Sequence, residues 1–291
     1  MAGLKQMFSR GMRRKNMADT LYVTDLDKTL MRDDLTVSDY TIREMNRLID
    51  EGVKITYATA RSFKSAYDIT KDIKFRVPVI TRTGTTFADQ IEGKEIETAF
   101  FNEENIRELR SLLPKIDRCG FTSVYIDGMM YKVFKEGPKC PETQGYIDYY
   151  KSKGDKRMRM VATTDEMWEG DISYITLIAS QEELTPYYDS IKNSDRWEYI
   201  FQKDAYRDEY WLEICPKNAT KAKAVLKLKE RLGCDKVVVF GDSLNDLPMF
   251  EIADVACAVS NAMDEVKNVS DVVIGSNEED GVVNYILNDI G

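Results

Sequence analysis

Histidine is absent from this sequence of 291 residues. Without imidazole, Ser-His-Asp and Cys-His catalysis, histidine-ligated zinc sites and imidazole pH switches are all excluded. Any acid–base chemistry must therefore come from carboxylates, Lys, Tyr or Cys side chains.

Cysteine is scarce, with five residues in the whole chain, an odd total. They are scattered and form no CxxC pair, which argues against a disulfide framework and against a zinc site. We expect them to be plain thiols in a reducing cytoplasm. The five are Cys119, Cys140, Cys215, Cys234 and Cys257.

Long apolar runs and an excess of positive charge are also missing. No run approaches the roughly 18 residues of a membrane span, so we expect no integral membrane protein. The 41 Lys+Arg against 50 Asp+Glu give a net charge of −9. This acidic balance argues against broad binding to nucleic acid or to an anionic membrane surface. Residues 1–18 are basic but lack an apolar signal core, so we expect a disordered extension, with a targeting peptide as the alternative.

The remaining chain alternates short apolar strands with amphipathic helices. Residues 19–84 predict strand–helix–strand–helix–strand, and the same alternation returns in residues 212–291. This pattern is typical of an α/β fold with a doubly wound parallel sheet. Between the two pieces, residues 85–211 predict hairpins, helices and aromatic-rich strands. We interpret this segment as an inserted α+β domain.

Acidic side chains follow the best-defined strands of the predicted sheet. Asp25 and Asp27 follow the first strand, Thr59 follows the second, and Asp242 and Asp246 follow the strongly β-branched strand at 237–240. In an open parallel sheet, ligands bind at the carboxyl ends of the strands. Four carboxylates at one edge need a counter-ion, and oxygen ligands of this kind suit Mg²⁺.

The pair Asp25 and Asp27 has a particular spacing. In an extended backbone, residues i and i+2 point the same way, about 6.6 Å apart at ~3.3 Å per residue. One such carboxylate can act as a nucleophile while the other acts as a proton donor. An isolated Asp-x-Asp also fits a turn, a helix cap or a calcium loop. Its position after a buried strand, facing Asp242 and Asp246, favours the catalytic interpretation.

Lys221 lies in the first turn of a predicted helix, where the helix dipole disfavours a cation. A cation in this place suggests anion binding, because helix N-termini attract phosphate. The alternative is a solvated charged face, since Lys217 and Lys223 are close in sequence. We expect Lys221 to be exposed at the helix start. Thr59 has a similar alternative, because threonine is common at strand ends.

Four motifs taken together resemble a known family. They are Asp25-Leu26-Asp27-Lys28-Thr29, Thr59 in ATARS, Lys221 in NATKAKAV, and Asp242 with Asp246 in GDSLNDLPMF. In this order they are similar to the four motifs of the haloacid-dehalogenase-like (HAD) hydrolases, and most similar to the Cof-like, type IIB sugar-phosphatase branch. The resemblance covers about residues 20–290, and the inserted α+β domain stands where those enzymes carry their cap.

The resemblance implies a Mg²⁺-dependent phosphatase that acts on a small phosphorylated metabolite through an aspartyl-phosphate. Asp25 would be the nucleophile, and Asp27 would be the general acid and then the base. The metal ligands would be the carboxylates of Asp25 and Asp242 and the backbone carbonyl of Asp27, with Asp246 supporting the metal and the lysine from behind. The phosphoryl oxygens would be held by Thr59, Lys221, Asn245 and the amides of Leu26 and Ala60.

The sequence departs from the family pattern in two places. Thr59-Ala60-Arg61 replaces the usual Thr-Gly-Arg, and Thr83-Gly84-Thr85 stands where Asn-Gly-Ala is common. The second departure lies at the expected hinge to the cap and puts substrate contacts in doubt.

Two other functions fit the same motifs. One is a sugar phosphomutase of the same fold, and the other is a regulator that binds metal or phosphate without catalysis. The substrate and the oligomeric state cannot be read from the sequence. Asp127, Trp168 and Glu169 are candidates for substrate contacts in the cap, with ordinary packing as the alternative.

Overall fold

A computed structural model describes residues 19–137, 139–204 and 207–290. The extension expected at residues 1–18 lies outside the described residues. The chain divides into two compact units. The first unit comprises the chain up to Glu97 and from Lys221 onward, and the second unit comprises Thr98–Thr220.

The first unit is built on a five-stranded sheet in the order β14-β13-β12-β1-β2. Every neighbouring pair in this sheet is parallel, which confirms the predicted α/β class. The strands are β1 (Thr20–Thr24), β2 (Lys54–Tyr57), β12 (Lys236–Gly241), β13 (Val255–Val259) and β14 (Val272–Ile274).

The register of this sheet brings distant parts of the chain to one edge. Thr24 at the end of β1 is paired with Phe240 of β12 and with Tyr57 of β2. The residues that follow these strands therefore leave the sheet at the same level. Because all the strands run in one direction, their carboxyl ends form a single edge.

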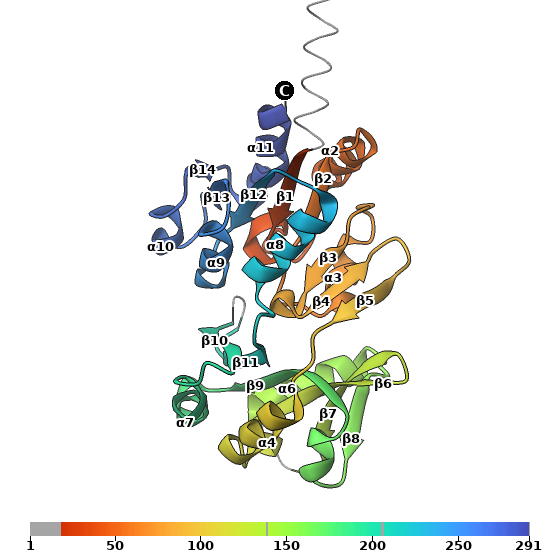
Figure 1. The fold of residues 1–291 in the computed structure, drawn as a ribbon, viewed down its shortest axis with the longest axis vertical. Helices are drawn as coiled ribbons and strands as arrows, with labels where there is room; N and C mark the ends of the chain where they lie inside the picture. Colours follow the sequence, from red (N-terminus) through yellow and green to blue (C-terminus); the bar gives the residue numbers. More distant parts are fainter. Residues whose placement is uncertain (1–18, 138, 205–206, 291) are drawn as a thin grey trace, which may run out of the picture. The chain divides into compact units, whose positions relative to one another are not determined.

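The helices of the first unit pack on this sheet (Figure 1). Helix α2 (Asp39–Asp50) begins after Ser38, whose hydroxyl accepts a hydrogen bond from the Thr41 amide, as an N-cap does. The other helices of this unit are α3 (Phe63–Thr70), α8 (Lys221–Leu232), α9 (Leu247–Phe250), α10 (Asp264–Lys267) and α11 (Gly281–Ile290). Helix α2 packs with α11, and α8 packs with α9.

A second, three-stranded sheet in the order β3-β4-β5 also belongs to the first unit. It consists of β3 (Val79–Thr81), β4 (Thr86–Asp89) and β5 (Lys94–Thr98). The sequence boundary at residue 85 placed β4 and β5 in the inserted domain. In the structure β4 continues antiparallel from β3, and Glu97 pairs with Lys227 and Arg231 of α8, so these strands cluster with the first unit.

The second unit contains a six-stranded sheet in the order β10-β11-β9-β6-β7-β8. Its strands are β6 (Gly120–Ile126), β7 (Met129–Lys135), β8 (Met158–Val161), β9 (Asp171–Ala179), β10 (Trp197–Lys203) and β11 (Tyr210–Pro216). Because β11 pairs with β9 and β10, this unit extends to Thr220 instead of ending at residue 211.

Helices cover both faces of the second sheet. They are α4 (Glu103–Leu112), α5 (Ile116–Cys119), α6 (Pro141–Ser152) and α7 (Gln181–Ile191). Leu109 of α4 and Leu184 of α7 join the larger core, whereas Tyr146 and Ile147 of α6 pack on Phe121 and Phe134 in a smaller cluster.

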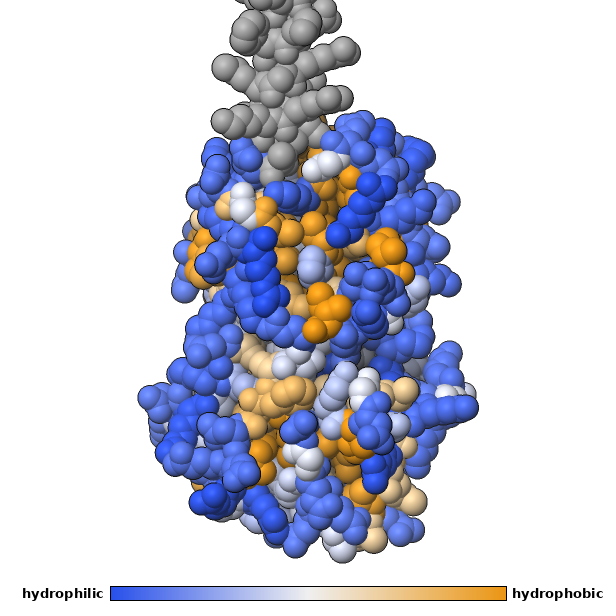
Figure 2. Space-filling view, turned by 45° about the vertical axis from the view of Figure 1, so that its right-hand side comes forward, coloured by the Kyte–Doolittle hydropathy of each residue, from blue (hydrophilic) through white to orange (hydrophobic). Residues whose placement is uncertain are grey.

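Large apolar side chains on the surface are scattered. Examples are Ile91 and Ile96 in the first unit and Met129 and Met160 in the second. Figure 2 shows apolar areas between hydrophilic side chains on the visible face of each unit. In the described part of the chain, the helices are too short or too polar to cross a bilayer.

Candidate active site

The first acidic residue of the site lies where β1 ends. The amide of Asp25 donates to the carbonyl of Phe240 over 2.9 Å, which continues the ladder between β1 and β12 by one residue. The chain then turns sharply, with Lys28 in the left-handed region at φ 54°. Asp25 is 5% exposed and Leu26 is fully buried. The turn therefore holds a carboxylate inside the protein at the edge of the sheet.

Lys221 is the counter-charge of this carboxylate. Its Nζ lies 2.6 Å from Oδ1 of Asp25 and 2.8 Å from Oδ1 of Asp246. The expectation that Lys221 is exposed was wrong, because the side chain is only 2% exposed. The start of α8 points this lysine inward, where two carboxylates compensate for its loss of water.

Asp246 is fully buried and fixes the loop after β12. Its Oδ2 accepts hydrogen bonds from the amides of Asp242 and Ser243, while its Oδ1 accepts from Lys221. A Cβ atom at Gly241 would lie 2.7 Å from the Cβ of Asp246. Only glycine allows this close approach, so the glycine that ends β12 has a steric cause.

Clustering of acids shifts the proton affinities of the site. Burial raises the pKa of Asp25 well above its ordinary value, Lys221 opposes this shift, and Asp246 and Asp242 add to it. Burial and Asp246 raise the pKa of Asp242 to about 7. Burial alone would lower the pKa of Lys221, but Asp246 and Asp25 raise it above the ordinary value. The lysine therefore stays charged, and a further cation nearby would stabilise the ionised form of the acids.

Three carboxylates form a group that suits a divalent metal ion. Oxygen atoms of Asp25, Asp242 and Asp246 lie within 4.8 Å of one another. Thr29 donates to Oδ1 of Asp242, and both oxygens of Asp246 accept hydrogen bonds. Among the described residues, Oδ2 of Asp25 and Oδ2 of Asp242 accept none. This all-oxygen donor set fits a hard divalent cation.

Asp27 lies two residues after Asp25 and makes a different contact. Its two carboxylate oxygens accept hydrogen bonds from Nε and Nη2 of Arg61, over 2.8 and 2.6 Å. Such a two-pronged pair fixes both distance and orientation. Sequence reasoning missed this role of Arg61, although the residue lies within the quoted ATARS motif. The sequence feature that could have indicated this role is a positively charged residue two positions after Thr59.

The loop that carries Thr59 and Arg61 is held by the hairpin loop 82–85. The amide of Thr83 donates to the carbonyl of Thr59, and the amide of Arg82 donates to the carbonyl of Arg61. The hydroxyl of Thr59, which is fully buried, accepts from the amide of Arg61. These bonds fix the end of β2 relative to the start of β4.

This hairpin loop is strained in the places where the sequence departs from the family pattern. Arg82 and Thr83 have φ of 48° and 58°. A β-branched residue such as Thr83 rarely adopts this conformation, whereas asparagine accepts it more readily. The hydroxyl of Thr85 is buried and has no hydrogen-bond partner among the described residues. Thr83 and Thr85, both in the second departure from the family pattern, therefore each have a local structural cost.

The other sequence candidates occupy different surroundings. Oδ1 of Asn245 accepts from the Ser243 hydroxyl over 3.0 Å and lies 3.5 Å from Nζ of Lys221. The phosphate-binding roles of Asn245, Leu26 and Ala60, and the metal contact of the Asp27 carbonyl, remain predictions. Trp168 is 6% exposed within the core of the second unit, a position that fits ordinary packing.

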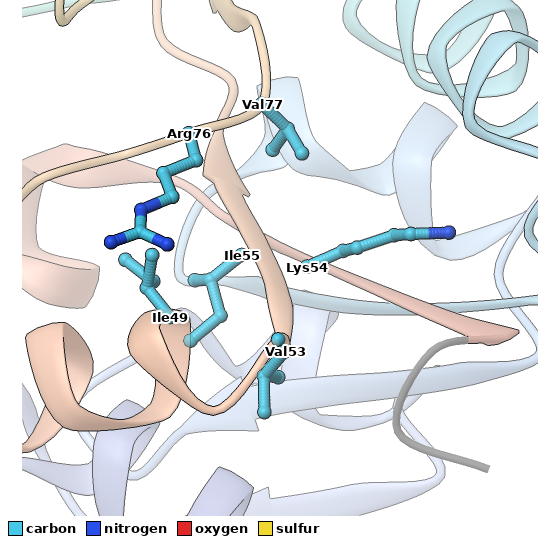
Figure 3. Close-up of a pocket in the computed structure, with 7 residues that line it drawn as sticks. Ile49, Val53, Lys54, Ile55, Arg76 and Val77 are labelled. Carbon is cyan, nitrogen blue, oxygen red and sulfur yellow. The ribbon is translucent and has the colours of Figure 1, made fainter. Parts of the chain in front are cut away.

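A separate hollow of about 150 Å³ lies beside the first residues of β2 (Figure 3). Its cations are already engaged, because Lys54 donates to the carbonyl of Leu232 and Arg76 pairs with Asp50. The site residues follow the opposite, carboxyl end of the strand. We therefore do not assign the reaction to this hollow, which is lined by Ile49, Gly52, Val53, Lys54, Ile55, Arg76 and Val77.

The parallel α/β sheet of the first unit thus carries buried acids and a buried lysine at its carboxyl edge, which together form an acidic centre able to hold a metal ion. The chain matches the family model of the haloacid dehalogenase-like hydrolases over residues 22–286. It belongs to this family, as the four motifs predicted.

Relatives and solved structures agree with this assignment. A Bacillus subtilis protein named 5-amino-6-(5-phospho-D-ribitylamino)uracil phosphatase YwtE is 24% identical over 286 residues, covering 90% of this chain and 95% of its own. The crystal structure of TM0651 from Thermotoga maritima is 27% identical, with a TM-score of 0.69, covering 93% of this chain and 97% of that one. The structure of the HAD subclass IIB sugar phosphatase BT4131 is similar in fold, with 19% identity, a TM-score of 0.71, and coverage of 94% and 100%.

Proposed function

We propose that this protein is a phosphatase that hydrolyses small phosphate monoesters, with sugar phosphates or chemically related metabolites as substrates. The contact of Lys221 with both Asp25 and Asp246 carries the proposal. It combines a nucleophilic carboxylate with a fixed positive charge at the place where a phosphoryl group would bind. Relatives named as phosphatases, including one that acts on a phosphorylated ribitylamino compound, support the substrate class.

In the first step, an oxygen of Asp25 attacks phosphorus, and the bond between phosphorus and the ester oxygen breaks. Asp27 first leaves Arg61, takes up a proton from solvent and turns to the substrate, and the leaving alkoxide then takes this proton. The product alcohol leaves, and Asp25 carries the phosphoryl group as an acyl phosphate. Lys221 compensates for negative charge on the Asp25 side throughout this step.

In the second step, water attacks the phosphorus of the aspartyl-phosphate. Asp27, now ionised, takes a proton from this water, and the bond between phosphorus and Asp25 breaks. Inorganic phosphate leaves, and Asp25 is regenerated as a carboxylate. Asp27 then carries the proton taken from water and can serve as the acid of the next turnover. When it releases this proton to solvent, Arg61 re-forms its two hydrogen bonds with the carboxylate.

We further propose that Mg²⁺ is the metal, held by Asp25 and Asp242 with Asp246 behind them. When bound, the ion would neutralise the acids and polarise the phosphoryl oxygens. The protein's acidic net charge makes such local positive charge necessary for an anionic substrate. The thiols, none of which forms a disulfide, support a cytoplasmic location.

A panel of phosphorylated metabolites, assayed for released phosphate with Mg²⁺ and with excess EDTA, tests this proposal. We expect metal-dependent release that is abolished in Asp25→Asn. Asp50→Asn is a matched control, because Asp50 is an exposed aspartate that pairs with Arg76 away from the site. Full activity in EDTA would contradict the metal assignment, and activity of Asp25→Asn would contradict the nucleophile.

A further inference from the structure

Two buried thiols of the second unit lie in direct contact. The Sγ atoms of Cys119 and Cys140 are 2.9 Å apart. Cys119 ends α5, and Cys140 immediately precedes α6. A disulfide bond has a sulfur–sulfur distance of about 2.05 Å, so bonding requires an approach of less than ~1 Å.

The backbone around this pair is already joined. The amide of Cys140 donates to the carbonyl of Arg118 over 2.9 Å, which fixes the two chain segments beside each other. This backbone hydrogen bond therefore keeps the two thiols close to each other in the folded protein. Between them the chain forms β6 and β7, so a bond would close a loop around this hairpin.

We propose that Cys119 and Cys140 form a reversible disulfide within the second unit, with a low-molecular-weight disulfide as the oxidant. The inference is independent of the phosphatase proposal, because it concerns residues outside the acidic site. It adds a covalent modification site to a protein whose other thiols do not share this geometry: Cys234 contacts the amine of Lys54, and Cys257 contacts the ring hydroxyl of Tyr285.

The exchange proceeds in two balanced steps. The Cys119 thiolate attacks one sulfur of the small disulfide, forming a mixed disulfide and releasing one thiol. The sulfur of Cys140, after losing its proton to solvent, then attacks the Cys119 sulfur and releases the second thiol. The protein loses two electrons and two protons, and the small disulfide gains them as two thiols.

The surroundings assign the order of these steps and their speed. Burial raises the pKa of both thiols, and the hydrogen bond from Cys140 counteracts this rise at Cys119. Cys119 is therefore the better thiolate, and Cys140 resolves the mixed disulfide. Because the two side chains are 4% and 2% exposed, reagent enters only when the α5–α6 region opens locally. Oxidation is thus slower than that of a surface thiol.

The test uses the full chain, purified in the reduced state and incubated with oxidised glutathione. Remaining thiols are then alkylated in denaturant, and the protein is digested without reduction and analysed by mass spectrometry. We expect a peptide pair joined through Cys119 and Cys140, with Cys215, Cys234 and Cys257 alkylated. We also expect a melting temperature raised by several degrees, which dithiothreitol returns to the starting value, because closure of this loop restricts the unfolded chain.

Two variants serve as a matched pair. Cys140→Ser removes the resolving thiol, so glutathione should stay attached to Cys119 and the rise in melting temperature should disappear. Cys257→Ser removes an equally buried thiol of the first unit and should leave the Cys119–Cys140 link unchanged. Mapping of the wild-type link does not depend on whether either variant folds.

Three results would overturn the proposal. The first is full alkylation of both thiols after an exposure to oxidised glutathione that links cysteines in the denatured chain. The second is glutathione adducts on the wild type without the internal link. The third is links in which Cys119 pairs with the other cysteines as often as with Cys140.

Discussion

Each unit of the molecule buries a lysine, and the two lysines differ in how their charge is compensated. Lys221 of the first unit is 2% exposed and contacts the carboxylates of Asp25 and Asp246. Lys132 of the second unit is 7% exposed, donates a hydrogen bond to the hydroxyl of Tyr146, and has its Nζ 4.3 Å from the ring centre of Tyr150.

The difference follows from the two kinds of sheet. A parallel sheet has all its carboxyl ends at one edge, so acids from distant segments gather there and a buried cation becomes necessary. In the antiparallel second sheet Lys132 lies in mid-strand, where it donates a hydrogen bond to the hydroxyl of Tyr146 and makes a cation–π contact with the ring of Tyr150, both from α6. Both arrangements hold a cation in the interior, and in the first unit this cation contacts Asp25, the residue that we propose as the nucleophile.

The sharpest test of this comparison replaces each lysine by methionine. We expect Lys221→Met to lower kcat/KM by about a thousandfold, as loss of a preorganised charge-stabilising group does. It should also cost about 3–5 kcal/mol of stability, because Asp25 and Asp246 lose their counter-charge. Lys132→Met should affect stability alone, with kcat/KM for a small aryl phosphate unchanged.

Steady-state kinetics with denaturant unfolding separate these outcomes. Lys223→Ala, an exposed lysine in the same helix turn, is the control for the general effect of removing a charge. Equal losses of activity in Lys221→Met and Lys132→Met would remove the distinction between the two sites.

A second prediction concerns Asp27 and its partner Arg61. Asp27→Asn should lower turnover of a sugar phosphate by about a hundredfold or more, because the alkoxide then leaves without a proton. With an aryl phosphate, whose leaving group needs no proton, Asp25 should still be phosphorylated and the phosphoenzyme should accumulate as a burst. Arg61→Gln should give a smaller loss and no trapped phosphoenzyme, since the carboxylate remains. Wild-type turnover of a sugar phosphate by Asp27→Asn would assign the proton transfer to another group.

The pH dependence of stability gives a third, smaller effect that distinguishes the acidic edge from the rest of the molecule. Folding raises the pKa of Asp242 from 3.8 to about 7. The group therefore stabilises the fold while protonated, and this contribution is lost as the pH rises through 7. In metal-free protein, the melting temperature of Asp242→Asn relative to that of the wild type should rise from pH 4 to pH 7 and level off above pH 7. Added Mg²⁺ should reduce this gap, and a gap that shrinks with rising pH would refute the assignment.

The smallest effect is expected in the strained hairpin loop. Thr83→Asn should stabilise the protein by about 1 kcal/mol, because asparagine accepts the left-handed conformation that Thr83 adopts. Thr85→Ala should be neutral or slightly stabilising, because it removes a buried hydroxyl without a partner. Thermal unfolding measures both, with Thr81→Ala as the control, since the Thr81 hydroxyl donates to a carbonyl. Destabilisation by Thr83→Asn would show that the threonine side chain itself is needed there.

Much of the first unit was predictable because its signals are local. The Ser38 cap, the strand at Thr20–Thr24 and the motif residues Asp25, Asp242 and Asp246 follow from sequence patterns that the packing does not override. The burial of Lys221 was not predictable, because neighbouring lysines make the helix start look solvated. Only the long-range pairing of β1 with β12 brings its two carboxylates together.

Other features depended on contacts between distant segments. The short strand Met158–Val161 escaped prediction because half of its residues are exposed and its partner β7 lies beyond a whole helix. The hairpin β4–β5 was predicted as a hairpin but placed in the inserted domain, since a sequence does not tell which unit a hairpin packs against. The Arg61–Asp27 pair joins residues 34 positions apart.

Because Lys221 lies late in the chain, the ribosome makes Asp25 long before its counter-charge. Asp25 leaves the ribosome 196 residues before the lysine that neutralises it. The second unit, Thr98–Thr220, is an uninterrupted segment and is complete before Lys221 appears. It can therefore fold on the nascent chain. Until β12 is synthesised, the edge of β1 that pairs with β12 has no partner strand. A chaperone or the ribosome surface could shield this edge of β1 in the segment up to Glu97. Such shielding would precede the synthesis of Lys221 and β12, and therefore the formation of the acidic centre.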